Sequence, residues 1–299
     1  MNKESVAIIG AGPSGMAMAI QLRRYGIEPL VFEKDEPGGL LRNANLVENY
    51  PGFPGGIRGP ELVDLMVNQL EDSRVKVLAE EVTSLDFRGN AFVLRTSKKR
   101  YQFQRVAVAT GTKPIQASLA EYGSQSDRLI SYEVYPILKE KWKKIVIVGA
   151  GDAAFDYALN LAWQNGVTIL NRGSEVASLP LLVERARNHP NITYYQNTAI
   201  SRIDLDDSGS RATLTCTSPA GMRRIAADHL IFAIGREPCR NYFSNTVLEC
   251  QDELIEQERL FMIGDVKNDI FRQTAIAVGD GVLAAMKLYR ASKAVKVSK

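Results

Sequence analysis

The chain has 299 residues, which is enough for two ordinary hydrophobic cores, so two domains are expected. Hydrophobic residues make up 45% of it and charged residues 24%, a globular composition that excludes intrinsic disorder. The formal net charge of +3 is small for this length and gives no indication of a nucleic-acid or membrane-surface partner.

The sequence lacks the usual signals of export and membrane insertion. No uninterrupted apolar run approaches the ~20 residues that a membrane-spanning helix needs, and the N-terminus shows no signal-peptide pattern. Cys216, Cys239 and Cys250 form no close pair, which fits a reducing compartment. We therefore expect a soluble, cytoplasmic protein with no nucleic-acid or membrane partner, and no metal site, because no cluster of metal-ligating residues is present.

An apolar run over residues 6–9 opens directly into Gly10, Gly12 and Gly15, and an amphipathic stretch over residues 16–25 follows. Strand, glycine turn and helix start are the parts that bind a dinucleotide pyrophosphate. Gly10 allows the turn, Gly12 lets the backbone approach the phosphates, and Gly15 lets the helix pack against the strand. The free N–H groups at the helix start meet the phosphate charge.

A second strand, predicted over residues 28–33, ends in Glu33. This acid lies about twenty residues beyond the glycine turn, where a carboxylate can hold the ribose hydroxyls of a dinucleotide. The alternative is a glycine turn in some other α/β protein.

Glycines and prolines then mark two loops, at residues 37–40 and 48–56, which are predicted to be ordered and functional because Asn, Tyr and Phe interrupt the small residues. Residues 60–70 have helical spacing, with Leu62, Leu65, Met66 and Leu70 expected on one face. Strands are predicted at residues 75–77, 82–87, 91–96 and 101–109.

The pattern is then repeated. Residues 144–154 again give a strand, a glycine turn with Gly149 and Gly151, and a helix start, with Ala154 where the first copy has Gly15. A helix through Asn165 follows, with strands at residues 167–170, 192–195, 200–205, 212–217 and 229–235. Two fingerprints in matching positions indicate a half-fold used for two different dinucleotides.

Near the C-terminus a strand over residues 259–263 enters Gly264-Asp265, and Arg272-Gln273-Thr274 precede a helix over residues 275–289. Asp265 can accept hydrogen bonds from a ribityl chain, and the nearby helix start can face the N1/O2 edge of an isoalloxazine ring. The alternative is an ordinary strand–helix turn, because Asp is a common N-cap.

Taken together, the chain resembles the thioredoxin-reductase-like pyridine-nucleotide flavoproteins over nearly its whole length. The motifs that carry the resemblance are Gly10-Ala11-Gly12-Pro13-Ser14-Gly15, Gly38-Gly39, Glu48-Asn49-Tyr50-Pro51-Gly52-Phe53, Ala109-Thr110-Gly111, residues 149–154, Gly264-Asp265-Val266 and Arg272-Gln273. The resemblance implies two Rossmann-like, three-layer domains, each with a parallel central sheet and a β-meander. It places an FAD domain at residues 1–113 and 239–299, an inserted NAD(P)H domain at residues 114–238, and it implies a homodimer.

The resemblance also implies the cofactor contacts. For FAD they are Gly10, Gly12, Pro13, Ser14, Gly15, Glu33, Lys34, Gly38, Gly39, Leu40, Asn49, Val82, Ala109, Thr110, Gly111, Gly264, Asp265, Arg272, Gln273 and Thr274. For NAD(P)H they are Gly149, Gly151, Asp152, Ala153, Ala154, Arg172, Ile234 and Gly235.

The chain departs from this family at the redox-active disulfide. Thioredoxin reductases carry Ser-Tyr-Cys-x-x-Cys before the second glycine turn, but this chain has Glu133 and Pro136 in place of both sulfurs. No thiolate can form there, so classical thioredoxin reductase activity is not expected. Glu133 and Tyr135 are weak catalytic candidates, because this segment faces the flavin in the family; the alternative is a polar surface loop.

The related bacilliredoxin reductases place a cysteine inside the first glycine turn, where this chain has Ser14. Serine cannot perform thiol exchange, so Ser14 is instead expected to donate a hydrogen bond to the pyrophosphate.

The nicotinamide is predicted from the end of the second strand of the inserted domain. NADPH enzymes of the family carry His-Arg-Arg there, whereas this chain has Asn171-Arg172-Gly173. NADPH is favoured over NADH, because no acid would repel a 2′-phosphate and one arginine remains. Arg185 or Arg187 could supply further positive charge.

These observations predict an FAD-dependent NAD(P)H oxidoreductase that passes electrons to a non-thioredoxin acceptor: a ferredoxin, another protein, a quinone or a small molecule. The alternative is an FAD-binding electron-transfer or sensing module that does not use nicotinamide, for example a ferredoxin-linked one. Hinges between the domains are expected near residues 112–114 and 235–238, because the family requires the nucleotide domain to swing.

Overall fold

The computed structural model describes residues 6–122 and 129–297, which form two compact units. Unit 1 contains residues up to 42, residues 47–113 and residues from 237 on, and unit 2 contains residues 43–46 and 114–236. The chain passes between them at strands β8 (Thr112–Pro114) and β17 (Arg236–Pro238), which pair in a two-stranded sheet.

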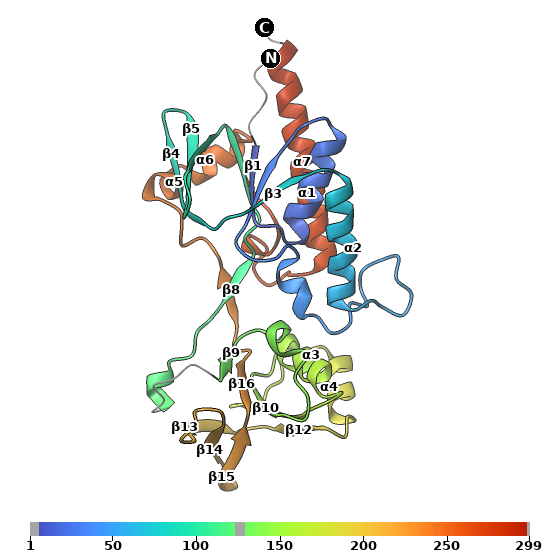
Figure 1. Cartoon of the computed structure of the whole chain (residues 1–299), viewed down its shortest axis with the longest axis vertical. Helices are drawn as coiled ribbons and strands as arrows, with labels where there is room; N and C mark the ends of the chain where they lie inside the picture. The colour runs from blue at the N-terminus through green and yellow to red at the C-terminus, as the bar shows by residue number, and fades with distance from the viewer. Residues whose placement is uncertain (1–5, 123–128, 298–299) are drawn as a thin grey trace. The chain divides into compact units, whose positions relative to one another are not determined.

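Unit 1 is built on a five-stranded parallel sheet in the order β18-β7-β1-β2-β3. Around this sheet, β4–β6 form an antiparallel sheet, α1, α2 and α7 lie side by side (Figure 1), and α5 and α6 precede β18. The bounds are β1 Val6–Ile9, α1 Pro13–Arg24, β2 Leu30–Glu33, η1 Gly39–Asn43, α2 Gly59–Asp72, β3 Lys76–Ala79, β4 Val82–Arg88, β5 Ala91–Thr96, β6 Arg100–Phe103, β7 Arg105–Val108, α5 Asn245–Glu249, α6 Gln251–Glu256, β18 Leu260–Met262, η4 Gly264–Val266 and α7 Thr274–Val297.

The side chains of β1 alternate between the two faces of the unit 1 sheet and contact the layer on each face. Val6 and Ile8 are buried in one hydrophobic cluster with residues of α1 and α7. Ala7 and Ile9 are buried in another cluster with residues of β4–β6, α5 and α6. Because successive side chains of a strand point to opposite faces, the four apolar residues fill two cores. The predicted three-layer architecture is therefore present in unit 1.

Unit 2 repeats this plan with a parallel sheet in the order β12-β11-β10-β16-β9. Ile145 and Ile147 of β10 pack with residues of α3 and α4, while Val146 packs with residues of the meander β13-β14-β15. The bounds are η2 Leu119–Tyr122, β9 Ile130–Ser131, η3 Tyr135–Ile137, β10 Lys144–Val148, α3 Asp152–Leu161, β11 Gly166–Leu170, α4 Pro180–Arg187, β12 Ile192–Tyr195, β13 Ala199–Leu205, β14 Ala212–Ser218, β15 Gly221–Ala227 and β16 His229–Phe232. The predicted duplication is confirmed, since β16 pairs with β10 as β7 pairs with β1.

Three predictions in unit 1 are wrong in detail. The single strand predicted over residues 101–109 is two strands, because β6 pairs antiparallel with β5 whereas β7 pairs parallel with β1 and β18. Leu65 is 51% exposed and does not lie on the buried face of α2, which Val63 completes instead. The final helix extends beyond residue 289 to Val297.

Two predictions in unit 2 also differ from the structure. The helix predicted to run through Asn165 ends at Leu161, and the Asn165 amide donates hydrogen bonds to the Leu161 and Glu140 carbonyls. Strand β15 was not predicted, because Arg223 and Arg224 interrupt its apolar pattern. No helix within residues 6–122 or 129–297 is long and apolar enough to cross a membrane.

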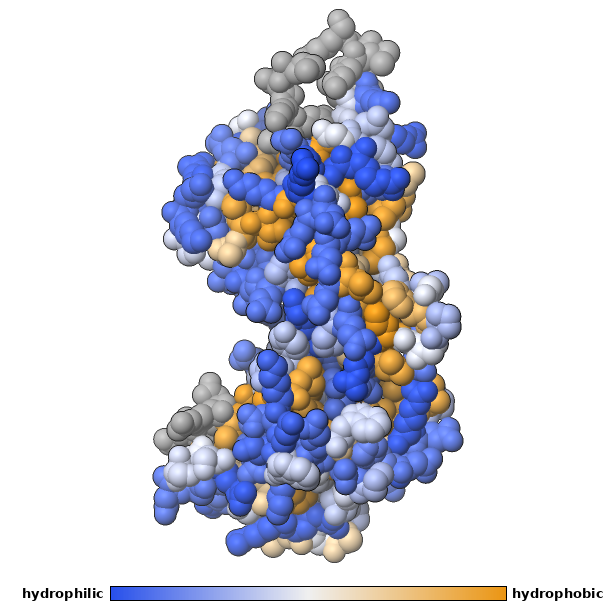
Figure 2. Space-filling model, turned by 45° about the vertical axis from the view of Figure 1, so that its right-hand side comes forward, coloured by the Kyte–Doolittle hydropathy of each residue, from blue (hydrophilic) through white to orange (hydrophobic). Residues whose placement is uncertain are grey.

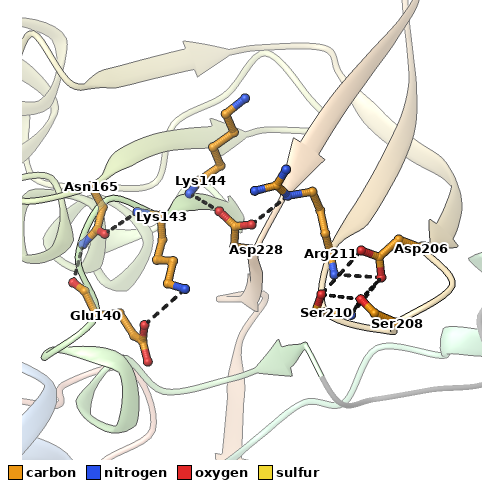
Figure 3. Close-up of polar contacts among 9 residues, drawn as sticks. All are labelled: Glu140, Lys143, Lys144, Asn165, Asp206, Ser208, Ser210, Arg211 and Asp228. Carbon is orange, nitrogen blue, oxygen red and sulfur yellow. Dashed lines mark hydrogen bonds and ion pairs between the residues drawn. The ribbon is translucent and has the colours of Figure 1, made fainter.

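Polar side chains fix the start of β10 (Figure 3). The carboxylate of Asp228 accepts hydrogen bonds from the Lys144 backbone N–H at 2.8 Å and from Arg211 Nε at 2.9 Å. Burial raises the pKa of Asp228, but these two hydrogen bonds and the positive charges of Arg211 and Lys143 together hold the pKa below its ordinary value. Asp206 in turn organises the β13–β14 loop by accepting from the backbone N–H of Ser210. Asp228 thereby links β10 to the start of β14.

Asp228→Ala is expected to lower the free energy of unfolding by about 2 kcal/mol, because a charge-assisted pair and a backbone hydrogen bond are lost together. Urea unfolding at pH 7 measures the change. Asp207→Ala is the control, since Asp207 is exposed in the same loop region. Equal stability of the two variants would contradict the role given to Asp228.

Candidate functional site: two glycine turns at the carboxyl ends of parallel strands

The first glycine turn packs tightly against strand β7. A Cβ atom at Gly10 would lie 2.5 Å from the carbonyl oxygen of Ala109, and one at Gly15 would lie 2.0 Å from the carbonyl oxygen of Gly10. At Gly12, in contrast, no atom lies within 4 Å of a Cβ position. Helix α1 begins next to it at Pro13, and the N-cap residue Gly12 supplies no side-chain cap. The open side of the turn is therefore a helix N-terminus suited to an anion.

Glu33 lies at this turn, as its position after the second strand predicts. Its Oε2 accepts a hydrogen bond from the Ala11 N–H at 2.7 Å, and its Oε1 accepts one from the Asp35 N–H at 3.1 Å. Each carboxylate oxygen keeps a lone pair for a ribose hydroxyl. The Gly38 N–H donates to the Ala11 carbonyl at 2.8 Å, so the loop at residues 38–39 also borders the turn.

The C-terminal motif packs onto the start of α1 through Ser14. A Cβ atom at Gly264 would lie 2.6 Å from Ser14 Oγ, and one at Gly281 would lie 2.2 Å from the Ser14 carbonyl oxygen. Two glycines thus allow η4 and α7 to approach α1 closely, which brings Asp265 to the first glycine turn.

Two further hydrogen bonds connect predicted FAD residues to parts of unit 1 that are distant in sequence. Asn49 Nδ2 donates to Gln273 Oε1 at 2.8 Å, so the loop at residues 48–56 meets the Arg272-Gln273 pair. Thr110 Oγ1 donates to the carbonyl oxygen of Cys239 at 2.8 Å. The whole predicted FAD set belongs to unit 1, although Val82 is buried in the core between the sheets.

The second glycine turn has the same geometry in unit 2. A Cβ atom at Gly149 would lie 2.4 Å from the Ala233 carbonyl oxygen, whereas the nearest atom to one at Gly151 is 3.7 Å away. Helix α3 begins at Asp152 without a side-chain cap, and Asp152 Oδ1 accepts from the Leu179 N–H at 2.7 Å. Ala154 is fully buried behind the turn. The predicted NAD(P)H residues all belong to unit 2.

Each of the two turns has space beside its backbone that fits the pyrophosphate of a dinucleotide. Only at the second glycine of each turn is there room beside the backbone, and uncapped helix N–H groups border that room. A pyrophosphate bound there would satisfy backbone donors that the protein leaves without a side-chain partner.

Within unit 2, Glu133 is the centre of a polar cluster. Its Oε1 lies 2.6 Å from Arg236 Nη1, and its Oε2 accepts from Asn43 Nδ2 at 2.6 Å and from Tyr157 OH at 3.4 Å. Asn43 Oδ1 accepts from the backbone N–H groups of Val134 and Tyr135 at 3.0 and 2.9 Å. Burial raises the pKa of Tyr157, and the Glu133 charge raises it further, so the phenol stays protonated. Glu133 therefore holds its own segment in place.

Asp156 on α3 contacts residues 43–46, the stretch that also supplies Asn43. Burial raises the pKa of Asp156 to about 6, although its Oδ2 accepts a hydrogen bond from the Asn45 N–H at 2.9 Å. The charge of Asp152 raises the pKa in the same direction. A carboxylate in this position destabilises the folded unit near neutral pH.

Asp156→Asn is expected to stabilise the protein at pH 7 by on the order of 2 kcal/mol while leaving its stability at pH 4 unchanged. The native Asp156 carboxyl binds a proton between about pH 4 and pH 6 and the unfolded one does not, so the wild-type unfolding free energy falls as pH rises through that window. Thermal unfolding from pH 4 to pH 8 measures the slope.

The asparagine oxygen still accepts from the Asn45 N–H, so the variant changes charge alone. Glu184→Gln on α4, an exposed site, is the control and should leave the profile unchanged. An unaltered slope in Asp156→Asn would show that this carboxyl does not titrate as described.

All three cysteines are free thiols. Burial raises the pKa of Cys216, which lies in the core between the unit 2 sheet and its meander. Burial also raises the pKa of Cys250, whose Sγ donates to the Thr246 carbonyl. Raised thiol pKa values make both residues poor nucleophiles at neutral pH.

Sequence reasoning missed Asn43, Asp156 and Arg223, whose side chains meet residues from distant parts of the chain. The one signal for Arg223 was the Ser218-Pro219-Ala220-Gly221 turn after a predicted strand. A turn of this composition indicates a hairpin, whose second strand contains Arg223.

Fold and turns together define a doubly wound α/β protein with two glycine turns of the dinucleotide-binding type. The family model of the pyridine nucleotide-disulphide oxidoreductases matches residues 4–281. The chain belongs to this family, whose thioredoxin reductase members use FAD and NADPH.

Individual relatives are similar in sequence to this chain along nearly its full length. The thioredoxin reductase of Streptomyces clavuligerus is 31% identical over 300 residues, covering 96% of this chain and 93% of that protein. The thioredoxin reductase of Chlamydia pneumoniae is 28% identical, covering 95% of this chain and 97% of that protein. The crystal structure of Lactococcus lactis thioredoxin reductase superposes with a TM-score of 0.81 at 26% identity, covering 97% of this chain and 99% of that one.

Proposed function

We propose that the chain transfers hydride from NADPH to FAD and then passes the electrons to an acceptor without using a protein disulfide. The observation that carries this proposal is the pair of open helix N-termini, one in each unit, at Gly12 and Gly151. FAD, when bound, accepts a hydride at N5 and can release electrons singly or in pairs. Unit 1 would hold FAD through its first glycine turn, Glu33 and Asp265, and unit 2 would hold the nicotinamide dinucleotide.

The predicted domain boundaries and site residues are part of this proposal. Residues 1–113 and 239–299 form the FAD-binding part, and residues 114–238 form the NAD(P)H-binding part. Glu133 and Tyr135 then serve to position their segment, since the Glu133 carboxylate is already held by Arg236 and Asn43.

The acceptor belongs to a class other than the disulfide of thioredoxin. Positions 133 and 136 hold Glu and Pro, so the chain has no thiol pair there to relay electrons. A ferredoxin, another redox protein, a quinone or a small molecule can take electrons directly from a reduced flavin. The curated relatives quoted above are named for thioredoxin, and thioredoxin is therefore included in the acceptor screen.

Purified protein is expected to be yellow and to bleach anaerobically when NADPH is added. Gly151→Glu should abolish this bleaching while FAD stays bound and reducible by dithionite, because a side chain and a negative charge would fill the pyrophosphate site. Gly166→Glu is the matched control, since Gly166 is exposed at the amino end of β11 and a Cβ there would come no closer than 4.0 Å to another atom, the Lys143 carbonyl oxygen. Stopped-flow absorbance of the flavin measures the bleaching of wild type, Gly151→Glu and Gly166→Glu.

A colourless protein that cannot be reconstituted with FAD would overturn the proposal. A yellow protein that bleaches with reduced ferredoxin but with neither nicotinamide would instead support the alternative, an electron-transfer or sensing module.

The triple variant Cys216→Ser, Cys239→Ser, Cys250→Ser should keep NADPH-driven flavin reduction and acceptor turnover within about three-fold of wild type. None of the three residues lies in the segment that carries the redox pair in the family. Steady-state turnover with the best acceptor of the screen is the measurement. Retained flavin reduction with lost turnover would reveal a thiol relay, and Cys239 beside β17 would be examined first.

A homodimer is also part of the proposed function. Unit 1 exposes large apolar residues on one stretch of chain: Ile270, Phe271, Ile276, Leu283 and Met286. Figure 2 shows apolar surface on this unit among charged residues. Ile276, Leu283 and Met286 are spaced by seven and three residues, so they share a face of α7 that a second copy would cover.

A further inference from the structure

The turn that follows β11 is held rigidly and presents one cation. The buried Asn171 side chain donates to the Glu175 carbonyl at 2.8 Å and to Tyr194 OH at 3.0 Å, and it accepts from the Gly173 N–H at 3.0 Å. Arg172, between Asn171 and Gly173, is exposed. In the residues that the structure describes, Arg172 makes no ion pair, so its guanidinium is available to a ligand.

Backbone hydrogen bonds fix this turn against the end of β12. The Asn171 N–H donates to the Tyr195 carbonyl at 2.9 Å, and the Asn197 N–H donates to the Gly173 carbonyl at 2.9 Å. Leu170 and Tyr195 are partners in the parallel register of β11 and β12. Tyr195 is therefore an immediate neighbour of the Arg172 turn.

The meander supplies a second cation, Arg223, close to Tyr195. The guanidinium carbon of Arg223, in β15, lies 4.0 Å from the centroid of the Tyr195 ring. Arg223 pairs across the meander with Cys216, which is fully buried against the parallel sheet, so both side chains are on the sheet-facing side. Stacking on the ring fixes the plane of the guanidinium.

Arg223 lacks an anionic partner. Its Nε is buried and, within residues 6–122 and 129–297, has no hydrogen-bond partner, and no carboxylate of that range forms an ion pair with it. A partly buried cation with unsatisfied donors is unfavourable unless an anion is bound. An anion bound there would meet a donor that the described residues leave unpaired, beside the strand end that carries the Arg172 turn.

We propose that Arg223, stacked on Tyr195, forms with Arg172 the binding site for the 2′-phosphate of NADPH. This inference rests on the proposed function, because it assigns the nicotinamide dinucleotide to unit 2. The end of the second strand of a dinucleotide-binding fold is where the adenosine ribose is held. A phosphate monoester carries nearly two negative charges at pH 7, which two guanidinium groups match. Arg223 thus supplies from the meander the second positive charge that the strand end lacks.

Arg223→Ala is expected to raise the KM for NADPH by about 30-fold while changing kcat and the KM for NADH by less than two-fold. Arg223→Lys should give an intermediate KM, because an ammonium keeps the charge but loses the planar stack and the forked donors. Arg224→Ala is the matched control: Arg224 is the next residue in β15 and is exposed. Steady-state kinetics with both nicotinamides measure the effect.

Calorimetric binding of adenosine 2′,5′-bisphosphate and of AMP gives a readout that is independent of turnover. Wild type should bind the bisphosphate at least 10-fold more tightly than AMP, and Arg223→Ala should bind the two about equally. If neither nicotinamide reduces the wild-type flavin, the proposed function fails, whereas the calorimetric preference still tests the anion site.

Two results would overturn the inference. Arg223→Ala could leave both the KM for NADPH and the affinity for the bisphosphate unchanged. Alternatively, it could raise the KM for NADPH and NADH equally, which would mean that Arg223 only supports the meander.

Discussion

The structure depends on one close contact, made twice, between a glycine and the carbonyl oxygen of the neighbouring strand end. A Cβ atom would lie 2.5 Å from the Ala109 oxygen at Gly10 and 2.4 Å from the Ala233 oxygen at Gly149. Both glycine N–H groups also donate to the strand on the other side, to Phe32 at 2.8 Å and to Leu170 at 3.0 Å. The turn is held between two strands, and the following helix therefore begins at the carboxyl edge of the sheet with its N–H groups open.

From this shared geometry the two copies diverge in ways that suit different ligands. In the first copy, a Cβ atom at Gly15 would lie 2.0 Å from the Gly10 carbonyl oxygen, so only glycine fits. In the second copy, the equivalent residue is Ala154, whose methyl group is accommodated and fully buried. The first copy has the acid Glu33 at the end of its second strand, whereas the second copy has Arg172. An acid holds bare ribose hydroxyls and a cation attracts a phosphate, so the same half-fold can select two dinucleotides.

Where thioredoxin reductases place two sulfurs, this chain has a hydrogen-bonded cluster around Glu133. The carboxylate is held by Arg236 and Asn43, and the Asn43 amide holds the backbone of Val134 and Tyr135. A salt bridge and amide hydrogen bonds fix the segment without any redox-active atom. In the function that we propose, electrons therefore leave from the flavin itself.

The two glycine turns and the two parallel sheets could be predicted from the sequence, because they depend on local periodicity and on glycine spacing. The cofactors FAD and NAD(P)H followed from the family resemblance of the motifs. Glu33, Asp265 and Arg172 could be proposed from the sequence because they lie at or within two residues of the ends of predicted strands. Which polar side chains meet could be seen only in the folded chain. Asn43 and Glu133 are 90 residues apart, and Tyr195 and Arg223 come from different sheets. Such pairs depend on how sheets and meanders pack, and no pattern along one segment encodes a partner on another.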